Sequence, residues 1–287
     1  MVRKSVDDAV ATFHQDGFCV LPGLLGPETL VALNALTDHL LEEAVNVSGE
    51  TDVYDLEADH CPEQPAVRRI KKPHDIDKVF RDAAEQSELL QYLKALMGPD
   101  IRLHHSKINT KQPHRGSALE WHQDWAFIPH TNQNLVIVSI MLDPVDDENG
   151  PMMVIPTSHR NGLLDHRNPD GDFTGAIDPD DPALELERAI ALKGPSGTVT
   201  LHHPLLAHGA AANRSDRRRN VLFYEYAAAD AWPLFYGVDW PEYTRRLICG
   251  NECNEPRLEP CFVRMGFPRP YEGSIYANQQ AVRKRYF

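Results

Sequence analysis

The sequence predicts an α+β protein in which a helical shell over about residues 1–98 precedes a mainly β core over about 101–228. Apolar residues recur at helical spacing in the first part, whereas they alternate or form short runs after residue 100. Gly, Pro, Asn or Asp bounds each of these runs. Short strands separated by turn residues are typical of a sandwich or barrel, and the β core is expected to be antiparallel.

The first helix is expected to begin after Ser5, which can cap it, and to end at Gly17. The segment "FCVLPGLL" then resembles a strand and a turn. Pro27 opens a second helix, because proline suits the first helical position. Its apolar residues follow the helical period: Leu30, Leu33, Leu36, Leu40, Leu41 and Ala44.

An irregular, charged stretch is expected near 46–74, followed by a helical region over about 76–97 that ends at Gly98. The β core then begins with "IRLHHSKINTK", whose alternation predicts two faces. One face carries Ile101, Leu103, His105, Lys107 and Asn109, and the other carries Arg102, His104, Ser106, Ile108 and Thr110. Further strands are expected in "NLVIVSIML", "PMMVIP", "GTVTLHHPLLAHG" and "NVLFYEYAA".

The composition, with 42% hydrophobic and 25% charged residues, is that of a soluble globular protein. The formal net charge of −13, from 29 basic and 42 acidic residues, argues against nucleic acid or an anionic membrane as the main partner. The longest apolar run, "LVIVSIML" at 135–142, is far shorter than the about 18 residues of a membrane span. Five scattered cysteines and an acidic beginning suit a cytoplasmic protein. The oligomeric state is not predicted.

The stretch "WHQDW" at 121–125 contains the strongest chemical signal. His122 and Asp124 are two residues apart, so on a strand their side chains project from the same face and can converge on one point. Most of the 14 histidines are expected to be ordinary structural or solvated residues. Here the paired carboxylate and imidazole predict a metal site.

A third ligand has to come from another part of the chain, and the best candidate is His208 in "HHPLLAHGAAANRSDRRR". Two histidines and one carboxylate form the facial triad typical of non-haem Fe(II) oxygenases, which leaves coordination positions open. Spacing alone does not exclude four other histidines as the third ligand: His104, His105, His202 and His203.

Arg219 supplies an independent signal, eleven residues after His208 (219 − 208). A short hairpin through "AAANRSD" would set the two residues side by side on neighbouring strands. A guanidinium there could grip the far carboxylate of a dicarboxylate whose near end chelates the metal. The neighbouring arginines, Arg214, Arg217 and Arg218, are expected to be solvated.

These segments resemble the phytanoyl-CoA dioxygenase family of Fe(II)/2-oxoglutarate-dependent oxygenases. The resemblance rests on "WHQDW", "DPVDDENGPMMVIPTSH" and "HHPLLAHGAAANRSDRRR" in that order, supported by "FHQDGFCVLPGLLGPETL" and "LMGPDIRLHHSKINTKQP". It covers about residues 5–228. One departure is "TSH" at 157–159, where the family usually has "GSH".

The resemblance implies a double-stranded β-helix, the cupin-like jelly roll, flanked by N-terminal helices. The whole chain, 1–287, would be one dioxygenase domain with a C-terminal extension over about 229–287. The implied iron ligands are His122, Asp124 and His208, and Arg219 would bind 2-oxoglutarate. By similarity, Asn109 and His105 are also expected to contact 2-oxoglutarate, and Lys107 the prime substrate. Trp125 is expected to face the substrate cavity, while Trp121 packs in the β core.

The function implied is hydroxylation of an unactivated C–H bond in a small or medium-sized metabolite, with Fe(II) as cofactor and with 2-oxoglutarate and O2 consumed to give succinate and CO2. Related halogenases have a small residue in place of the carboxylate, so Asp124 favours hydroxylation or desaturation. Two alternatives are a zinc-type metal hydrolase and a non-catalytic jelly-roll binding protein.

Two further segments have open roles. The basic residues of "RRIKKPH" at 68–74 either line a site for an anionic substrate or form a solvated loop. The aromatic residues after 231 either cover the site as a lid or pack against the core. These aromatic residues are Trp232, Phe235, Tyr236, Trp240 and Tyr243.

Overall fold

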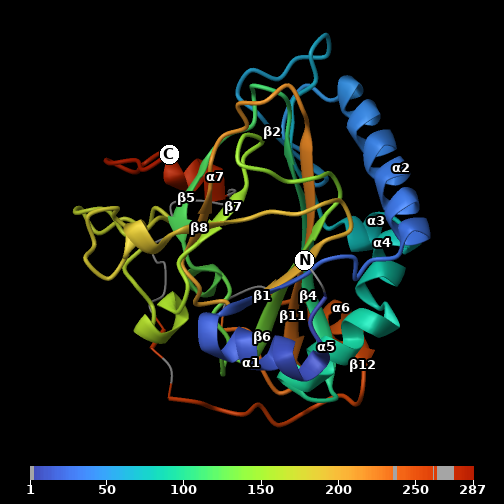
Figure 1. Ribbon diagram of the computed structural model, residues 1–287, viewed down its shortest axis with the longest axis vertical. Coiled ribbons are helices and arrows are strands. Elements are labelled where there is room, and N and C mark those ends of the chain that lie inside the picture. The colour runs from blue at the N-terminus through green and yellow to red at the C-terminus, as the bar shows by residue number, and fades with distance from the viewer. Residues whose placement is uncertain (1–2, 235–237, 261, 264–274) are drawn as a thin grey trace.

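Two antiparallel β-sheets pack together, and helices cover the outer side of the larger sheet (Figure 1). The computed structural model describes residues 3–234, 238–260, 262–263 and 275–287. The two sheets and the helices that precede them confirm the predicted mixture of a β core and an N-terminal helical shell. No helix in these ranges is long and apolar enough to cross a membrane.

The larger sheet has eight strands and the smaller has four. The order in the larger sheet is β1 (Phe18–Leu21), β9 (Val199–His202), β6 (Leu135–Met141), β11 (Arg219–Ala228), β4 (Ile101–Lys111), β3 (Val67–Lys71) and β2 (Tyr54–Leu56), with β12 (Leu247–Cys249) also paired to β4. The smaller sheet runs β5 (Leu119–His122), β10 (His208–Ala210), β7 (Met152–Val154) and β8 (Ile190–Leu192).

The helices lie mostly before the β core. They are α1 (Val6–Asp16), α2 (Pro27–Glu43), α3 (Pro73–Ile76), α4 (Lys78–Ala84), α5 (Ser87–Met97), α6 (Trp240–Thr244) and α7 (Ile275–Gln279). Short 3₁₀ turns occur at Ala44–Asn46, Asp124–Ala126, Ser158–Asn161 and Leu186–Arg188.

The predicted ends of the first two helices are confirmed. The Ser5 side chain accepts a hydrogen bond from the backbone N–H of Asp8, and Gly17 ends α1 with a φ of 85°, which favours glycine. Pro27 occupies the first turn of α2. The helical region predicted for 76–97 consists of two short helices, α4 and α5, and follows the one-turn helix α3; the helices are separate because Asp77 and Gln86 have non-helical backbone.

Strand β6 of the larger sheet is buried on both faces, which explains its continuous apolar run. Val136, Val138 and Ile140 pack with the helices on the outer side. Ile137 and Met141 alternate with them and pack on the inner side against residues of the smaller sheet. A strand that is buried on both sides needs no polar face.

The stretch predicted to be irregular near 46–74 contributes two strands, β2 and β3, to the larger sheet. The prediction missed them because β3 reads as a basic segment. Its charges are paired within the fold: Arg68 contacts Glu57, and both Arg69 and Lys71 contact Asp55. A charged sequence can form a strand when its neighbours supply the counter-charges.

A β-bulge in β4 changes the predicted division of that strand into two faces. His105 pairs with Glu225 and Leu103 pairs with Tyr226, the next residue of β11, so β4 has one extra residue at 104. As a result Leu103 packs in the same outer cluster as Ile108. The prediction that Ile101 and Leu103 share a face with Lys107 and Asn109 is wrong.

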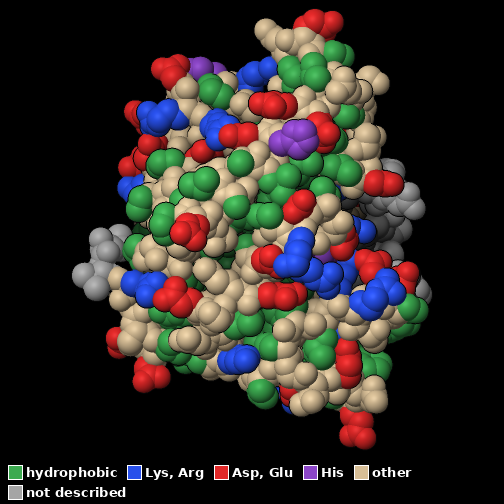
Figure 2. Space-filling view, turned by 90° about the vertical axis from the view of Figure 1, so that its right-hand side faces the viewer, with side chains coloured by type: hydrophobic (Ala, Val, Ile, Leu, Met, Phe, Trp, Pro, Cys, Tyr) green, Lys and Arg blue, Asp and Glu red, His purple; other side chains and the backbone are tan. Residues whose placement is uncertain are grey.

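Figure 2 shows the molecule turned by 90°, so that the right-hand side of Figure 1 faces the viewer. Lys and Arg side chains lie among Asp and Glu side chains on this face and form no continuous basic surface there. This mixed pattern agrees with the acidic composition.

Candidate functional site

Three ligand-type side chains converge at one end of a cavity between the two sheets. His122 ends β5, Asp124 begins the following 3₁₀ turn, and His208 begins β10, directly opposite His122 in the antiparallel pairing. One ligand atom from each lies within 4.8 Å of the other two. The Nε2 atom of His208 is 3.6 Å from Oδ2 of Asp124.

Both histidines present the same ring nitrogen to this point. The Nδ1 atom of His122 lies 2.8 Å from the carbonyl oxygen of Glu120, and that of His208 lies 2.9 Å from the carbonyl oxygen of Leu206. A carbonyl oxygen only accepts, so each Nδ1 carries the hydrogen and each Nε2 keeps a lone pair for a metal. Burial lowers the pKa of His208 to about 4 and that of His122 well below its usual value, so both rings are neutral at pH 7.

Asp124 is held as a carboxylate by its neighbours. Burial alone would raise its pKa, but His208 and a hydrogen bond from His202 outweigh burial and hold the pKa well below the usual value. The His202 Nε2 atom donates to Oδ2 of Asp124 at 3.1 Å. His202 is thus a positioning residue for the carboxylate. The sequence "HH" at 202–203 does not indicate which of the two rings takes this place.

Gln123, between His122 and Asp124, points away from the site. The side-chain Nε2 atom of Gln123 donates to the carbonyl oxygens of Gly162 and Leu205. Its side-chain oxygen accepts a hydrogen bond from the backbone N–H of Leu164. Gln123 is fully buried. It therefore ties the segments that follow β7 and β9 to the end of β5, which keeps the site rigid.

Gly209 allows the two ligand-bearing strands to approach closely. A Cβ atom at this position would lie 2.9 Å from the carbonyl oxygen of Leu119 and 2.7 Å from the ring of Phe287. Real Cβ atoms are essentially never closer than 3.0 Å to another heavy atom, so a larger residue would push β5 and β10 apart. Because Gly209 directly follows His208, a wider spacing of β5 and β10 would also move His208 away from His122.

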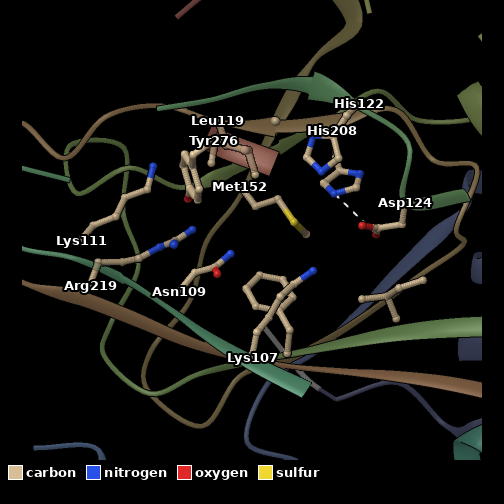
Figure 3. A pocket seen from close by; sticks show the side chains of 14 residues that line it. Lys107, Asn109, Lys111, Leu119, His122, Asp124, Met152, His208, Arg219 and Tyr276 are labelled. Carbon is tan, nitrogen blue, oxygen red and sulfur yellow. Dashed lines mark ion pairs between the residues drawn. The ribbon is translucent and has the colours of Figure 1, made fainter. Parts of the chain in front are cut away.

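The cavity runs from the three ligand-type residues to a basic far end (Figure 3). It holds about 460 Å³, including the part that opens to solvent. Its walls between the two ends include the apolar side chains of Leu119, Ile137, Met152 and Phe223. A size in this range suits small molecules.

Two buried cations, Lys111 and Arg219, form the far end. Each is only 2% exposed. Burial lowers the pKa of Arg219 to about 10, and burial together with Arg219 lowers that of Lys111 well below its usual value. Lys111 donates to the carbonyl oxygen of Ala211, but within the described ranges neither cation forms an ion pair with a carboxylate. Buried cations without a counter-charge are costly, so this end fits an anionic ligand.

Asn109 and Tyr276 complete the far end. Asn109 lines the cavity from β4 and accepts a hydrogen bond from Arg69 at 3.3 Å. Tyr276 comes from α7, near the end of the chain, and its ring lies 4.6 Å from the guanidinium carbon of Arg68. Burial raises the pKa of Tyr276, so its hydroxyl is a neutral donor.

The C-terminal segment is anchored to the smaller sheet. Gln279 of α7 accepts a hydrogen bond from the backbone N–H of Glu120, and the Glu120 carboxylate accepts from the backbone N–H of Tyr286. The ring of Phe287 stacks on Trp121, with centroids 5.9 Å apart. This end of the chain thus supports the site, and Trp121 packs in a buried cluster as predicted.

Lys107 lies on the side of the cavity near the three ligand-type residues (Figure 3). Its Nζ atom is 2.9 Å from a carboxylate oxygen of Glu225, which is on the neighbouring strand β11. Burial opposes ionisation of Glu225, but Lys107 outweighs it and lowers the pKa to about 2. The two residues therefore form a charged pair at pH 7.

Two residues expected in the site lie elsewhere. Trp125 is fully buried in a cluster with Leu135 and Leu205 and does not line the cavity. His105 sits at the bulge of β4, paired with Glu225, and is also absent from the cavity wall. Both were expected from sequence position, which shows neither how the turn after β5 redirects Trp125 nor how far along β4 the cavity extends.

The hairpin predicted between His208 and Arg219 is not formed. β10 pairs with β5 and β7 in the smaller sheet, whereas β11 pairs with β4 and β6 in the larger sheet. The connection crosses from one sheet to the other. His208 and Arg219 therefore face the same cavity from opposite sheets, which separates the ligand-type residues from the basic end.

The other candidates for the third ligand have different surroundings. The ring of His203 contacts Phe13 and His159, and the ring of His104 lies 4.9 Å from that of His130. The structure therefore brings together the set His122, Asp124 and His208, with His202 behind the carboxylate.

The two segments with open roles lie outside the cavity wall. Arg68 and Arg69 pair with acidic residues of the fold. Trp232 and Trp240 contact each other, and Tyr243 packs on Arg102. Phe235 and Tyr236 fall outside the described residues. The described aromatic residues of this segment thus pack against one another and the fold.

Two polar residues of the cavity wall, Lys111 and Tyr276, were not predicted from the sequence. Lys111 could have been found by extending the alternation of Lys107 and Asn109 by two residues. Tyr276 carries no comparable signal, because it reaches the cavity from a helix about 50 residues beyond the β core.

The donor set fits Fe(II). Two neutral imidazoles with free Nε2 lone pairs and one carboxylate provide the mixed nitrogen and oxygen ligands of the facial triad, and the cavity leaves the other coordination positions open to small molecules. The two unpaired cations at the far end fit the second carboxylate of a dicarboxylate that reaches the metal.

Comparisons with known proteins agree with this geometry. The family "Phytanoyl-CoA dioxygenase (PhyH)" matches residues 13–221. The probable alpha-ketoglutarate-dependent hypophosphite dioxygenase of Stutzerimonas stutzeri is 36% identical over 248 residues, covering 85% of this chain and 86% of that protein. The L-proline trans-4-hydroxylase of Streptomyces griseoviridis is 33% identical over 180 residues, covering 56% of this chain and 67% of that protein.

The fold is also similar to solved structures. The crystal structure of EctD from S. alaskensis with bound Fe has a TM-score of 0.68 and 25% identity, and the match covers 90% of this chain and 88% of that one. The ectoine dioxygenase of Sphingopyxis alaskensis is 27% identical over 248 residues, or 80% of this chain and 79% of that protein.

Proposed function

The chain belongs to the phytanoyl-CoA dioxygenase family, and from this premise we propose that His122, Asp124 and His208 bind the catalytic iron. The protein is an Fe(II)- and 2-oxoglutarate-dependent dioxygenase, an oxidoreductase that uses O2 and oxidises an unactivated C–H bond of a small or medium-sized metabolite with release of succinate and CO2. One observation carries the assignment of the iron site: two neutral imidazoles and a carboxylate converge within 4.8 Å.

We assign 2-oxoglutarate to the space between the iron ligands and the basic far end. Arg219 would bind the far carboxylate in a bidentate manner, with Lys111 as a second cation. The neutral hydroxyl of Tyr276 and the amide of Asn109 supply further hydrogen bonds. This assignment is supported by the absence of a carboxylate partner for either cation in the described part of the chain.

When bound, iron and 2-oxoglutarate supply the oxidising chemistry through decarboxylation of the 2-oxoglutarate. The contribution of this chain is positioning. His202 holds the Asp124 carboxylate, and the backbone carbonyls hold both imidazoles in the required tautomer. The apolar walls at Ile137, Met152 and Phe223 exclude water from the reacting groups.

The prime substrate is a small metabolite that shares the cavity with 2-oxoglutarate. The total space of about 460 Å³ leaves only part of the volume for it. The relative named as a probable hypophosphite dioxygenase makes that ion the first compound to test. Hypophosphite has P–H bonds and no C–H bond, so with this compound a P–H bond would be oxidised instead. Its match covers most of both chains, whereas the match to the proline hydroxylase covers 56% of this one.

The proposal includes three structural expectations. The two facing sheets would form a double-stranded β-helix, supported by the likeness to EctD. Residues 1–287 would act as a single domain, since the C-terminal segment contributes Tyr276 to the cavity. A cytoplasmic location is supported by the four described cysteines, which are all free thiols.

The test compares the wild-type protein with Asp124→Ala under anaerobic conditions. Adding Fe(II) and 2-oxoglutarate to the wild type should produce a weak visible charge-transfer band, and oxygen should then release succinate. Asp124→Ala should lose both while keeping its far-ultraviolet circular dichroism. Asp147→Ala is the matched control, because Asp147 is exposed and pairs only with Lys193 among the described residues.

Two outcomes would contradict the proposal. An Asp124→Ala protein with wild-type succinate formation would exclude the assigned iron site. Hydrolytic turnover that depends on zinc and is indifferent to 2-oxoglutarate would instead identify a metal hydrolase on the same three ligands.

A further inference from the structure

Lys107 is the cation that remains after the proposed iron and 2-oxoglutarate sites have been assigned. It projects from β4 into the cavity on the side of the iron ligands, whereas Lys111 and Arg219 lie at the opposite end (Figure 3). Its Nζ atom is 5.8 Å from the centroid of the Phe223 ring, which also lines this part of the wall. Lys107 is therefore available to the prime substrate.

The ammonium group of Lys107 is only partly satisfied by the protein. It has three N–H donors, and within the described residues its one hydrogen-bond partner is Glu225, at 2.9 Å. Glu225 is 4% exposed and does not line the cavity, so it approaches the ammonium from behind. The Lys107 side chain keeps 18% of its surface exposed. The remaining donors can thus bind a ligand in the cavity.

The charges of the cavity wall favour an anion over a cation. Three of its side chains are cationic, Lys107, Lys111 and Arg219, while the only carboxylate among the lining residues is Asp124. Asp124 belongs to the proposed iron site, so a cationic substrate would find no free counter-charge in the wall. This positive interior lies in a protein of net charge −13, and therefore does not follow from the overall composition.

Resting on the proposed function, we propose that the prime substrate is a small oxyanion and that Lys107 binds its negatively charged group. Glu225 holds the lysine in place when no substrate is bound and keeps it charged. The chemistry that Lys107 recognises is shared by carboxylates and phosphorus oxyanions, since both accept charge-assisted hydrogen bonds from an ammonium. Lys107 is a substrate-binding residue and determines specificity for charge.

Binding can be measured without turnover by anaerobic titration. Ligands are added to the protein loaded with Fe(II) and 2-oxoglutarate, and the change in the visible absorption band gives a dissociation constant. The probes are hypophosphite and methylphosphonate for phosphorus oxyanions and propionate for carboxylates. Propionamide and propylammonium are the neutral and cationic counterparts of propionate. We expect at least one anion to bind at least tenfold more tightly than both counterparts.

The variant Lys107→Gln tests the assigned residue. It removes the charge, while the new amide can still donate to Glu225. Loss of one charge-assisted hydrogen bond should weaken anion binding by about tenfold to a hundredfold. The dissociation constant for 2-oxoglutarate should change by less than about twofold. Lys193→Gln is the matched control, because Lys193 forms an ion pair with Asp147 on the surface.

The variant Glu225→Gln separates substrate binding from a purely structural ion pair. It removes the negative charge behind Lys107, so anion binding should be retained or become tighter. If Lys107→Gln alone fails to fold, the double variant Lys107→Gln/Glu225→Gln keeps a neutral hydrogen-bonded pair and should show the same loss of anion binding.

The inference is overturned if no anion in the panel binds more tightly than the neutral and cationic probes, or if removing the lysine charge leaves anion affinity unchanged. Failure of the proposed function would give a different result. If the protein does not bind Fe(II) and 2-oxoglutarate, the absorption band would not form even in the wild type.

Discussion

His202 should control metal affinity without being a metal ligand. Its ring is fully buried, and Nε2 donates to Oδ2 of Asp124 at 3.1 Å. His202→Leu keeps a side chain of similar bulk but removes this donor, which leaves the carboxylate less well oriented. Loss of such an outer hydrogen bond costs about 10- to 100-fold in metal affinity, or about 1.4 to 2.7 kcal/mol.

The assay is titration of the apo-protein with Fe(II) under anaerobic conditions at pH 7.5, with a competing chelator to bring the dissociation constant into range. His202→Gln should recover much of the loss, because its amide can still donate to Asp124. His203→Leu is the control: the adjacent histidine contacts Phe13 and His159 instead of the carboxylate, so its replacement should change metal affinity by less than about twofold.

The reasoning is refuted if His202→Leu binds Fe(II) as tightly as the wild type, or if the glutamine variant is as weak as the leucine variant while both remain folded. The second result would mean that the size and shape of the imidazole matter and the hydrogen bond does not. Circular dichroism of each variant separates these outcomes from unfolding.

Three further predictions concern the basic end of the cavity and two buried histidines, His104 and His130. Arg219→Met should weaken 2-oxoglutarate binding by about a hundredfold, because a bidentate charge-assisted pair is lost, and calorimetry should find Fe(II) affinity within about twofold of wild type. Tyr276→Phe should weaken 2-oxoglutarate binding by about three- to tenfold through loss of one neutral hydrogen bond, and equal affinity in the same calorimetric assay would exclude the hydroxyl from the site. Burial lowers the pKa of His104 to about 4 and of His130 to about 3, so the unfolded chain takes up protons first as the pH falls below about 6.5. The free energy of unfolding of the metal-free protein should therefore fall by up to about 1.4 kcal/mol per pH unit for each of these histidines between pH 6.5 and 4. Urea unfolding of His130→Phe should show a shallower decrease of this free energy with falling pH. A decrease as steep as that of the wild type would contradict the prediction.

The sequence by itself determined the features that depend on neighbouring residues. The limits of α1 and α2 could be predicted because Ser5, Gly17 and Pro27 act on the adjacent turn of backbone. The convergence of His122 and Asp124 followed from their spacing of two residues. His208 and Arg219 were candidates from their own sequence context, and the order of the longer motifs then indicated the family, which implied their roles.

Only the tertiary structure decided which strands carry the two ends of the cavity. Spacing suggested a hairpin between His208 and Arg219, but β10 and β11 belong to different sheets, so the two residues face each other across the interior. Strand pairing is a long-range choice set by burial of both faces, and a short turn-rich segment fits either a hairpin or a crossing between sheets.

The tertiary structure also decided which way individual side chains point. One extra residue at the bulge of β4 reverses the faces on one side of it, and the turn after β5 carries Trp125 into a buried cluster away from the cavity. Tyr276 enters the cavity because Gln279 and the last residues bind Glu120, far away in the sequence. Local periodicity contains none of these contacts, because they depend on backbone irregularities and on packing between segments that are distant in the chain.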